Sequence, residues 1–375
     1  MSVKILAIVI VSQFFLNNIS AQSEKYTFPI GIHRPNLSWA GSLEKELEII
    51  EKMRIMGARS VRLNPNSKAE ADFVQHVLHA NRLGFKVNFE VSLAFPEFYH
   101  PNAQRRAKKK HWDPRYQLSD IKPVNVQVWA ANMFKELKAK GAVIEVVEVG
   151  NEFNWIDFNG DMPEIAGGKY YDYDSDWEDP DYVKIRKGLD LYGQILKIIR
   201  KEAEKTWGKG GVKVVSGGLV RHMSLGTWFK NHDATILAPQ VCLDILQGTH
   251  PRQTKATNYL KYADGIGIHF YPVVAELDLE KAKKSLGDEI RLTMDALVRV
   301  AGNNRKFWVT EWGFARHKKE FKTEEERFIV AENFLNVCKT LPYNWGTMYF
   351  FTFDGQKIHR AYEDGNYLSV SKIFK

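Results

Sequence analysis

Short apolar runs alternate with longer amphipathic segments along most of the chain, a pattern that predicts β-strands joined by helices. The apolar runs predict strands at residues 28–33, 59–63, 85–93, 142–150, 212–218, 264–272, 306–313 and 345–354. The amphipathic segments predict helices at residues 42–57, 70–84, 124–140, 182–206, 280–302 and 323–341. Residues 219–263 are less regular, and we expect shorter helical pieces there around 224–231 and 252–262.

The alternation of strand and helix predicts an α/β fold with parallel strands, because a helical crossover returns the chain to the same end of the sheet. Eight such units match a single (β/α)8 TIM barrel with long βα loops after strands 3, 4 and 5. A doubly wound sheet is the alternative. It is disfavoured because no Gly-rich phosphate loop follows any of the predicted strands.

The first 21 residues form a separate segment. Lys4 precedes an apolar run at residues 5–11, and the segment closes on the small residue Ala21. These features are typical of a secretory signal peptide at residues 1–21, which leaves a catalytic domain at 22–375. We therefore expect a secreted or periplasmic protein without a membrane span, since the apolar run is too short to cross a bilayer.

Composition narrows the classes of partner. The 375 residues are 44% hydrophobic, and the chain has only Cys242 and Cys338, which makes a poor case for a metal or a redox cofactor. The net charge is +8, with a basic run at residues 105–111. This run is either a solvated loop or a site for an acidic partner such as an anionic glycan. We expect no binding to nucleic acid, because no recognition motif for it is present. We also expect a monomer.

Chemically active side chains end most of the predicted strands, where a barrel of this kind carries its reactive groups. Glu152 and Glu311 end strands 4 and 7, so we expect them to face one another across the barrel mouth. Two facing carboxyl groups suit glycosidic bond cleavage, because one protonates the leaving oxygen while the other attacks the sugar or activates water. The other candidates at strand ends are His33, Arg62, Glu90, Asn151, His269, Tyr271, Trp312 and Phe351.

Four segments resemble motifs of the glycoside hydrolase clan A barrels. The segment "VGNEFNW" is similar to the strand-four motif, whose Asn-Glu pair supplies an amide and the acid/base, and "WVTEWGF" to the strand-seven motif, whose Glu is the nucleophile. The segments "VRLN" and "GIHFYP" resemble the strand-two and strand-six motifs. The resemblance spans the mature chain and is nearest to the family 5 and family 39 groups. One departure concerns strand 8, where "YFFTFD" has Phe351 or Phe353 in place of the Trp that many members put beneath the sugar.

The resemblance implies a retaining β-glycosidase in which Glu311 is the nucleophile and Glu152 the acid/base. Glu311 must stay ionised, and Arg62 and Tyr271 are the candidates that stabilise its charge. Asn151 is expected at the 2-hydroxyl of the sugar. The remaining candidates are His269 beside Glu152 or the sugar, His33 at a hydroxyl, and Trp155, Trp312, Phe95, Tyr99 and Phe351 as apolar faces for sugar rings.

Several alternatives stay open at this stage. Arg62 could instead form a structural salt bridge with Glu90, and His269 could be a core histidine. A non-catalytic carbohydrate-binding barrel would be expected to lack one of the two glutamates, and a metal-dependent hydrolase would need clustered His and Asp ligands. A transglycosylase would use the same residues as a hydrolase. A retaining enzyme predicts that the carboxyl groups of Glu152 and Glu311 lie about 5–5.5 Å apart.

Overall fold

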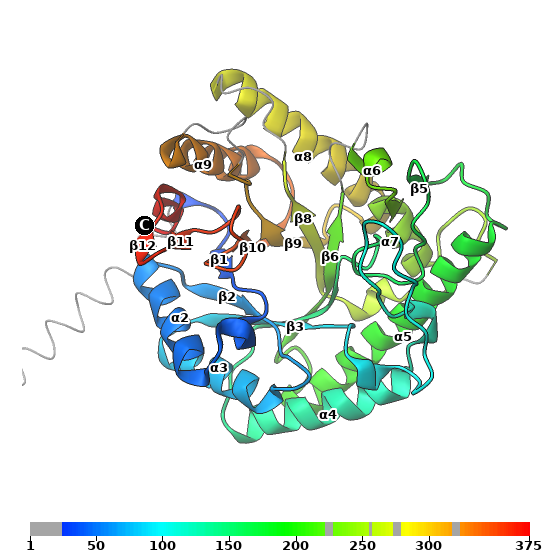
Figure 1. The fold of residues 1–375 in the computed structure, drawn as a ribbon, viewed down its shortest axis with the longest axis horizontal. Helices are drawn as coiled ribbons and strands as arrows, with labels where there is room; N and C mark the ends of the chain where they lie inside the picture. The colour runs from blue at the N-terminus through cyan, green and yellow to red at the C-terminus, as the bar shows by residue number, and fades with distance from the viewer. Residues whose placement is uncertain (1–24, 222–227, 255–256, 273–278, 317–322) are drawn as a thin grey trace, which may run out of the picture.

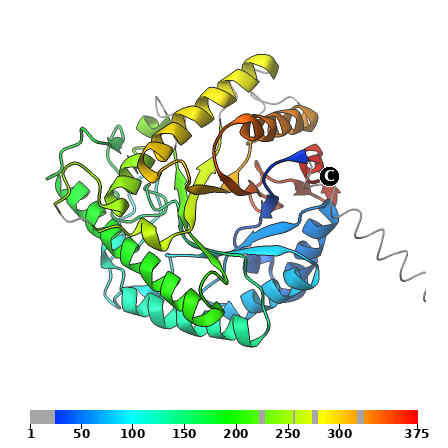
Figure 2. The same ribbon diagram turned by 180° about the vertical axis from the view of Figure 1, so that it is seen from behind.

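Eight parallel strands close into a barrel that is surrounded by helices, as Figures 1 and 2 show from its two ends. The computed structural model describes residues 25–221, 228–254, 257–272, 279–316 and 323–375. The expected signal peptide lies outside the described residues. The expectation of a (β/α)8 barrel is confirmed.

The barrel strands follow one another around the closed sheet in the order β1, β2, β3, β4, β6, β8, β9 and β10. They are β1 (Ile30–His33), β2 (Ser60–Leu63), β3 (Lys86–Val91), β4 (Val146–Asn151), β6 (Lys213–Val220), β8 (Gly265–Phe270), β9 (Lys306–Trp312) and β10 (Trp345–Phe351). The surrounding helices are α2 (Leu43–Met56), α3 (Glu70–Arg82), α4 (Pro123–Ala139), α5 (Pro180–Trp207), α7 (Pro239–Gln247), α8 (Leu279–Ala301) and α9 (Glu324–Thr340). All neighbouring barrel strands are parallel, so their carboxyl ends meet at one mouth.

The crossover after β6 differs from the expectation. Residues 252–262 carry no α-helix among their described residues; the chain there forms only a short 3-10 turn at Leu260–Tyr262. The crossover helix is α7, which the sequence reading missed. Pro239 occupies its first turn and Gly248 ends it in the left-handed conformation, with φ of 76°. A proline at the start and a glycine just past the end are the usual helix boundary signals, so the segment carried a readable signature. The expected piece around 224–231 appears as α6 (Trp228–Asn231) over its described part.

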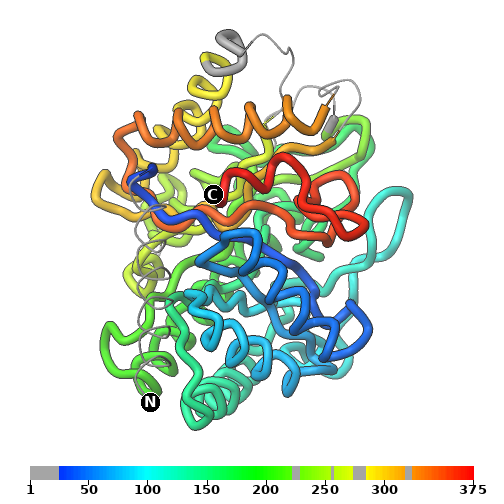
Figure 3. The backbone as a smooth tube through the Cα atoms, turned by 90° about the vertical axis from the view of Figure 1, so that its left-hand side faces the viewer, coloured from blue at the N-terminus to red at the C-terminus, as the bar shows by residue number. Residues whose placement is uncertain are grey.

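The long loops after β3, β4 and β6 gather at one side of the mouth. The loops after β4 and β6 pair through two short parallel strands, β5 (Lys169–Tyr171) and β7 (Thr235–Leu237). After β10 the chain forms β11 (Tyr362–Glu363), β12 (Asn366–Tyr367) and a 3-10 helix, η5 (Ser369–Phe374). Figure 3 shows this C-terminal segment between α9 and the N-terminal helices.

The floor of the barrel is filled by one small apolar cluster, formed by Val146, Val215, Trp308 and Tyr349. Gly265 and Gly346 line the ring of Trp308, and a Cβ at either position would lie 2.6 Å or less from that ring. Only glycine therefore fits beside the indole. Above this layer the interior is polar, which leaves the mouth end for chemistry rather than for core packing.

Candidate active site

Arg62 stands at the centre of the polar layer and organises it. Its side chain is fully buried at the end of β2. Nε donates to Glu148 Oε2 at 2.7 Å, Nη1 to Glu311 Oε1 at 2.7 Å, and Nη2 to Asn151 Oδ1 at 2.8 Å. A buried guanidinium needs such partners, because an unpaired charge in a protein interior is very costly. Arg62 thus joins side chains from β4 and β9 across the barrel.

Glu311, at the end of β9, is held as a carboxylate. Tyr271 donates its hydroxyl hydrogen to Oε2 at 2.5 Å, and Arg62 donates to Oε1. Burial alone would raise the pKa of this carboxyl, but the charge of His269, a hydrogen bond from His33 and the charge of Arg62 hold it well below its usual range. Burial and the nearby charge of Arg62 lower the pKa of His33 to about 3, so its imidazole is neutral near pH 7.

The pKa of Glu152, just past the end of β4, is shifted in the opposite direction. Burial raises its pKa, the charge of Glu311 adds to the rise, and a hydrogen bond with His269 opposes it. Oε1 lies 2.6 Å from His269 Nδ1, and Oε2 accepts from Trp155 Nε1 at 2.8 Å. The backbone of Glu152 is left-handed, with φ of 44°, and its N–H donates to the carbonyl of Gly218. This rarely populated conformation turns the carboxyl group into the mouth.

His269 lies between the two glutamates. Its Nδ1 is 2.6 Å from Glu152 Oε1 and 3.5 Å from Glu311 Oε2, and its Nε2 is 3.0 Å from Thr310 Oγ1. Burial would lower the pKa of His269, but Glu311 and Glu152 together raise it. Gly218 on β6 makes room for the ring, since a Cβ there would be 2.0 Å from Nε2. One oxygen of each glutamate and one His269 nitrogen lie within 4.8 Å of one another.

Two further buried acids belong to this layer: Glu148, which the sequence did not reveal as a site residue, and Glu90, which was expected only as a strand-end candidate or a salt-bridge partner of Arg62. Glu148 is fully buried and accepts from Arg62, from Asn88 Nδ2 at 3.1 Å and from the backbone of Gly218 at 3.2 Å. Glu90 lies beside it, since the two are register partners on β3 and β4. The signal for Glu148 is its position two residues from Val146 and Gly150 in an apolar strand, which places it on the interior face.

The candidate aromatic residues divide between the mouth and the core. Trp155 hydrogen-bonds to Glu152, and the ring of Phe351 lies 5.5 Å from that of His33 and 5.8 Å from that of Tyr271. Both therefore border the site.

Trp312 does not border the site, which corrects the expectation of a sugar-facing ring. It is fully buried and stacks on Phe334 of α9 at 4.9 Å. Successive residues of a strand point to opposite faces, so with Glu311 inside the barrel its neighbour packs outside. Phe95 packs on Phe98 and on Trp129 of α4, and Tyr99 stacks on Tyr116 within the loop after β3.

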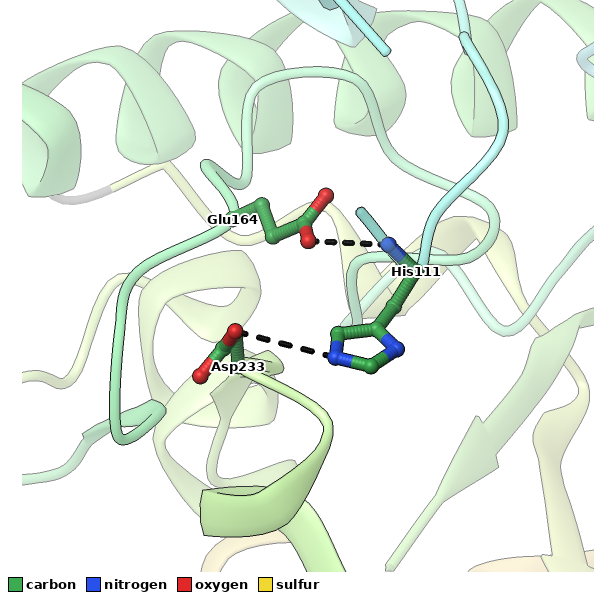
Figure 4. A group of neighbouring side chains, drawn as sticks. All are labelled: His111, Glu164 and Asp233. Atoms are coloured by element: carbon green, nitrogen blue, oxygen red, sulfur yellow. Dashed lines mark hydrogen bonds and ion pairs between the residues drawn. The ribbon is translucent and has the colours of Figure 1, made fainter. Parts of the chain in front are cut away.

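The three long loops are tied to one another by polar contacts. His111, Glu164 and Asp233 come from the loops after β3, β4 and β6, and Figure 4 shows their side chains grouped together. His111 Nε2 is 3.7 Å from Asp233 Oδ2, and Glu164 Oε1 accepts from the backbone N–H groups of Lys110 and His111. Their ligand atoms lie within 4.8 Å of one another, the spacing of a potential cation site. Glu164 already accepts hydrogen bonds from the backbone of the loop after β3, so we interpret these three side chains as contacts that hold the loops together.

Comparisons with solved structures agree with this fold. A GH5-4 broad-specificity endoglucanase from Clostridium acetobutylicum is 10% identical with a TM-score of 0.53, over 93% of this chain and 97% of that one. A GH5_18 protein from Bifidobacterium longum is 13% identical with a TM-score of 0.55, over 92% and 78%. A GH5_18 protein from Streptomyces cattleya, in complex with GlcNAc, is 11% identical with a TM-score of 0.55, over 92% and 79%.

The searches of family models and of curated proteins give no match. At identities this low, the structural likeness establishes the fold alone. The expected resemblance to glycoside hydrolase clan A barrels is confirmed at that level. Within the described residues, no helix is long and apolar enough to cross a membrane.

Proposed function

We propose that the protein is a retaining glycoside hydrolase that cleaves β-glycosidic bonds, with Glu311 as nucleophile and Glu152 as acid/base. One observation carries the proposal. Two buried glutamates share one mouth, and their surroundings shift their pKa values in opposite directions. A pair of carboxyl groups with separated pKa values is the arrangement that acid and nucleophile roles require.

The first step follows from these contacts. Glu152 gives its proton to the glycosidic oxygen while a Glu311 oxygen attacks the anomeric carbon, so the bond to the leaving group breaks as the glycosyl-enzyme bond forms. Arg62 and Tyr271 orient the Glu311 carboxylate for attack. His269 stays hydrogen-bonded to Glu152 and stabilises the carboxylate that the proton transfer leaves there. In the second step the Glu152 carboxylate takes a proton from water while the water oxygen attacks the anomeric carbon, so the bond to Glu311 breaks and the sugar is released.

The short distance between the carboxyl groups of Glu152 and Glu311 supports a mechanism that retains the anomeric configuration. An oxygen of Glu152 and an oxygen of Glu311 lie within 4.8 Å of each other. Inverting enzymes hold their carboxyl groups roughly 6.5–9.5 Å apart to admit a water molecule, whereas retaining enzymes need about 5–5.5 Å. The short separation favours direct attack by the carboxylate.

The substrate is proposed to be a carbohydrate, in keeping with the endoglucanase and the GlcNAc complex among the structural neighbours. We infer a secreted or periplasmic monomer from the N-terminal sequence and from the substrate class. We do not propose an anionic glycan, because several cations of the basic run have partners within the protein. Arg106 is buried against backbone carbonyls, Lys108 pairs with Asp113 at 3.1 Å, and Lys109 donates to the carbonyl of Glu164.

A chemical rescue experiment distinguishes the roles of the two glutamates. Glu311→Gln should not hydrolyse even 2,4-dinitrophenyl glycosides, because no glycosyl-enzyme forms. Glu152→Ala should still be glycosylated by these substrates, since dinitrophenolate leaves without a proton, and added azide should restore turnover with a β-glycosyl azide product.

The control is Glu145→Gln, an acid just before β4 that pairs with Lys86 at 3.5 Å and should behave as the wild type. Rescue of Glu311→Gln to a retained product, or wild-type rates in both variants, would contradict the assignment. An inverted product from the wild-type protein would exclude the retaining mechanism.

A further inference from the structure

Glu90 is a buried carboxyl group in the barrel mouth for which the proposed mechanism has no use. It is the penultimate residue of β3 and is 6% exposed. Its nearest cation is Arg62, whose Nη2 lies 3.8 Å from Glu90 Oε2. Within the described part of the chain, no group donates a hydrogen bond to it. Its register partner on β4 is Glu148, and the Arg62 nitrogen that lies nearest to it also donates to Asn151.

Arg62 has no donor to spare for Glu90. A guanidinium has five N–H groups in a fixed geometry. Two face Glu148, and the others face Glu311, His33 and Asn151. Glu90 therefore receives no hydrogen bond from this guanidinium.

A buried acid without donors is destabilising unless it is protonated or meets a ligand. Burial raises the pKa of Glu90 to about 7, which agrees with its lack of donors. The interior offers no packing reason for an acid at this position, because the apolar floor of the barrel lies below it and the mouth above it. A donor that enters through the mouth would satisfy the carboxyl group.

We propose that Glu90 binds a ring hydroxyl of the sugar in the mouth, the one next to the hydroxyl held by Asn151, and thereby determines which glycone is accepted. The inference rests on the proposed function. Asn151 ends the neighbouring strand, and its expected partner is the 2-hydroxyl, so in this proposal the next hydroxyl around the ring, at C3, is directed toward β3. A carboxylate is a strong acceptor for a sugar hydroxyl.

The same charges select against an acidic glycone. Glu90, Glu148 and Glu311 surround one guanidinium, and Glu152 lies opposite. A uronic acid would bring another carboxylate into this group, where like charges in a poorly solvated site repel strongly. The sugar bound next to Glu90 is therefore neutral, with a free 3-hydroxyl.

The test compares substrates as well as variants. A panel of 2,4-dinitrophenyl β-glycosides, a glucuronide included, identifies the glycoside that the wild-type protein hydrolyses fastest, and its 3-deoxy analogue is the partner substrate. Glu90→Ala should lower kcat/KM roughly 10- to 100-fold on the parent glycoside, the worth of a hydrogen bond to a charged group. The same substitution should change kcat/KM on the 3-deoxy analogue less than threefold. Glu90→Gln, which keeps an acceptor oxygen, should recover part of the loss.

The matched control is Glu97→Gln, an exposed acid in the loop after β3, which should leave both substrates unaffected. An equal loss on both substrates means that Glu90 acts structurally, and unchanged activity means that it does not touch the sugar. A glucuronide as the fastest substrate also overturns the inference. If the wild-type protein hydrolyses no glycoside and a 2-deoxy-2-fluoro glycoside leaves Glu311 unlabelled, the proposed function fails and the inference falls with it.

Discussion

Single residues in this site take their properties from their neighbours rather than from their type. Glu152, Glu311 and Glu90 are all buried glutamates in one mouth, yet Glu311 is held ionised while the other two have raised pKa values. Glu311 accepts from Arg62 and Tyr271, whereas no group in the described residues donates to Glu90. Glu152 has His269 and Trp155 as partners, but burial and the charge of Glu311 outweigh them. Burial penalises the charge of all three, and only hydrogen bonds and opposite charges reverse that penalty.

His269 offers a test of this coupling. It lowers the pKa of Glu152 through a hydrogen bond and its charge, and it also lowers that of Glu311. His269→Gln removes the charge, so both carboxyl pKa values should rise. The acidic limb of the kcat/KM profile needs ionised Glu311 and the basic limb needs protonated Glu152. Both limbs should therefore move to higher pH, with apparent values that belong to the coupled pair. A shift of either limb to lower pH would contradict the assignment.

Glu90 should make folding stability depend on pH whether or not the protein binds a sugar. Its pKa is raised from 4.5 to about 7 in the folded state, so between these values the folded protein binds more protons than the unfolded chain. The contribution of Glu90 to stability is therefore fully present below about pH 4.5 and is lost as pH rises through about 7. A shift of this size corresponds to about 3 kcal/mol. Glu90→Gln has no titrating group at this position. The free energy of unfolding of the variant, minus that of the wild type, should therefore increase by about that amount between pH 4.5 and 8.

Urea unfolding at several pH values measures this difference. A gap between variant and wild type that stays constant with pH would mean that Glu90 has an ordinary pKa and therefore an unrecognised donor. The substitution Glu136→Gln, at an exposed position of α4, should show no comparable pH dependence.

At the scale of elements, local signals predicted what local forces determine. Ser42 caps α2 and accepts from Lys45, and Gly57 ends that helix at φ of 116°, which agrees with the helix predicted at residues 42–57. Thr323 and Glu326 form a capping box that begins α9. The loops escaped prediction because they are held by contacts between segments distant in sequence. Arg106, in the basic run, is the clearest case: its Nη1 donates to the carbonyls of Ile156, Asn159 and Met162 in the loop after β4.

Arg106 and Arg105 allow a matched comparison of a structural and a surface cation. Arg106 is buried, whereas Arg105 is exposed and lies over the ring of Tyr116. Arg106→Met leaves several loop carbonyls without a donor, which should cost roughly 3 kcal/mol or more. Arg105→Met should cost less than about 1 kcal/mol. Hydrogen exchange should show the loss for Arg106→Met in the loops after β3 and β4 before it reaches the barrel strands. Equal effects of the two substitutions would contradict the structural role of Arg106.

At the scale of the whole molecule, the barrel and its two facing glutamates were predictable because both follow from strand count and from residues at strand ends. The rest of the site depends on which residues share a face and on the register between strands. Trp312 was misjudged although strand periodicity, with Glu311 inside, directs its neighbour to the helix layer. Glu148 and the bond between Arg62 and Asn151 required the register of strands far apart in sequence.

The net charge of +8 belongs to the whole molecule, and the last prediction concerns what that charge does. The mouth is rich in acids, while three lysines of the basic run, Lys108, Lys109 and Lys110, lie in a loop beside it. Lys108 pairs with Asp113, and Lys109 donates to the loop after β4. Two of these exposed lysines have partners within the protein and the mouth repels anions, so replacing all three with Gln should leave kcat/KM and its salt dependence on a neutral glycoside within about twofold.

Steady-state kinetics at low and high salt, with a neutral and an anionic polysaccharide, measure this directly. A neutral substrate gains nothing from a distant positive field, so long-range steering should not contribute to the rate on the neutral polysaccharide. We expect no contribution to the rate on the anionic polysaccharide either, because the mouth repels anions. A raised KM and a flattened salt dependence confined to the anionic polysaccharide would instead assign the basic run to substrate binding. The acidic mouth would then cleave a neutral sugar within a chain whose charged units lie outside it, on the loop after β3.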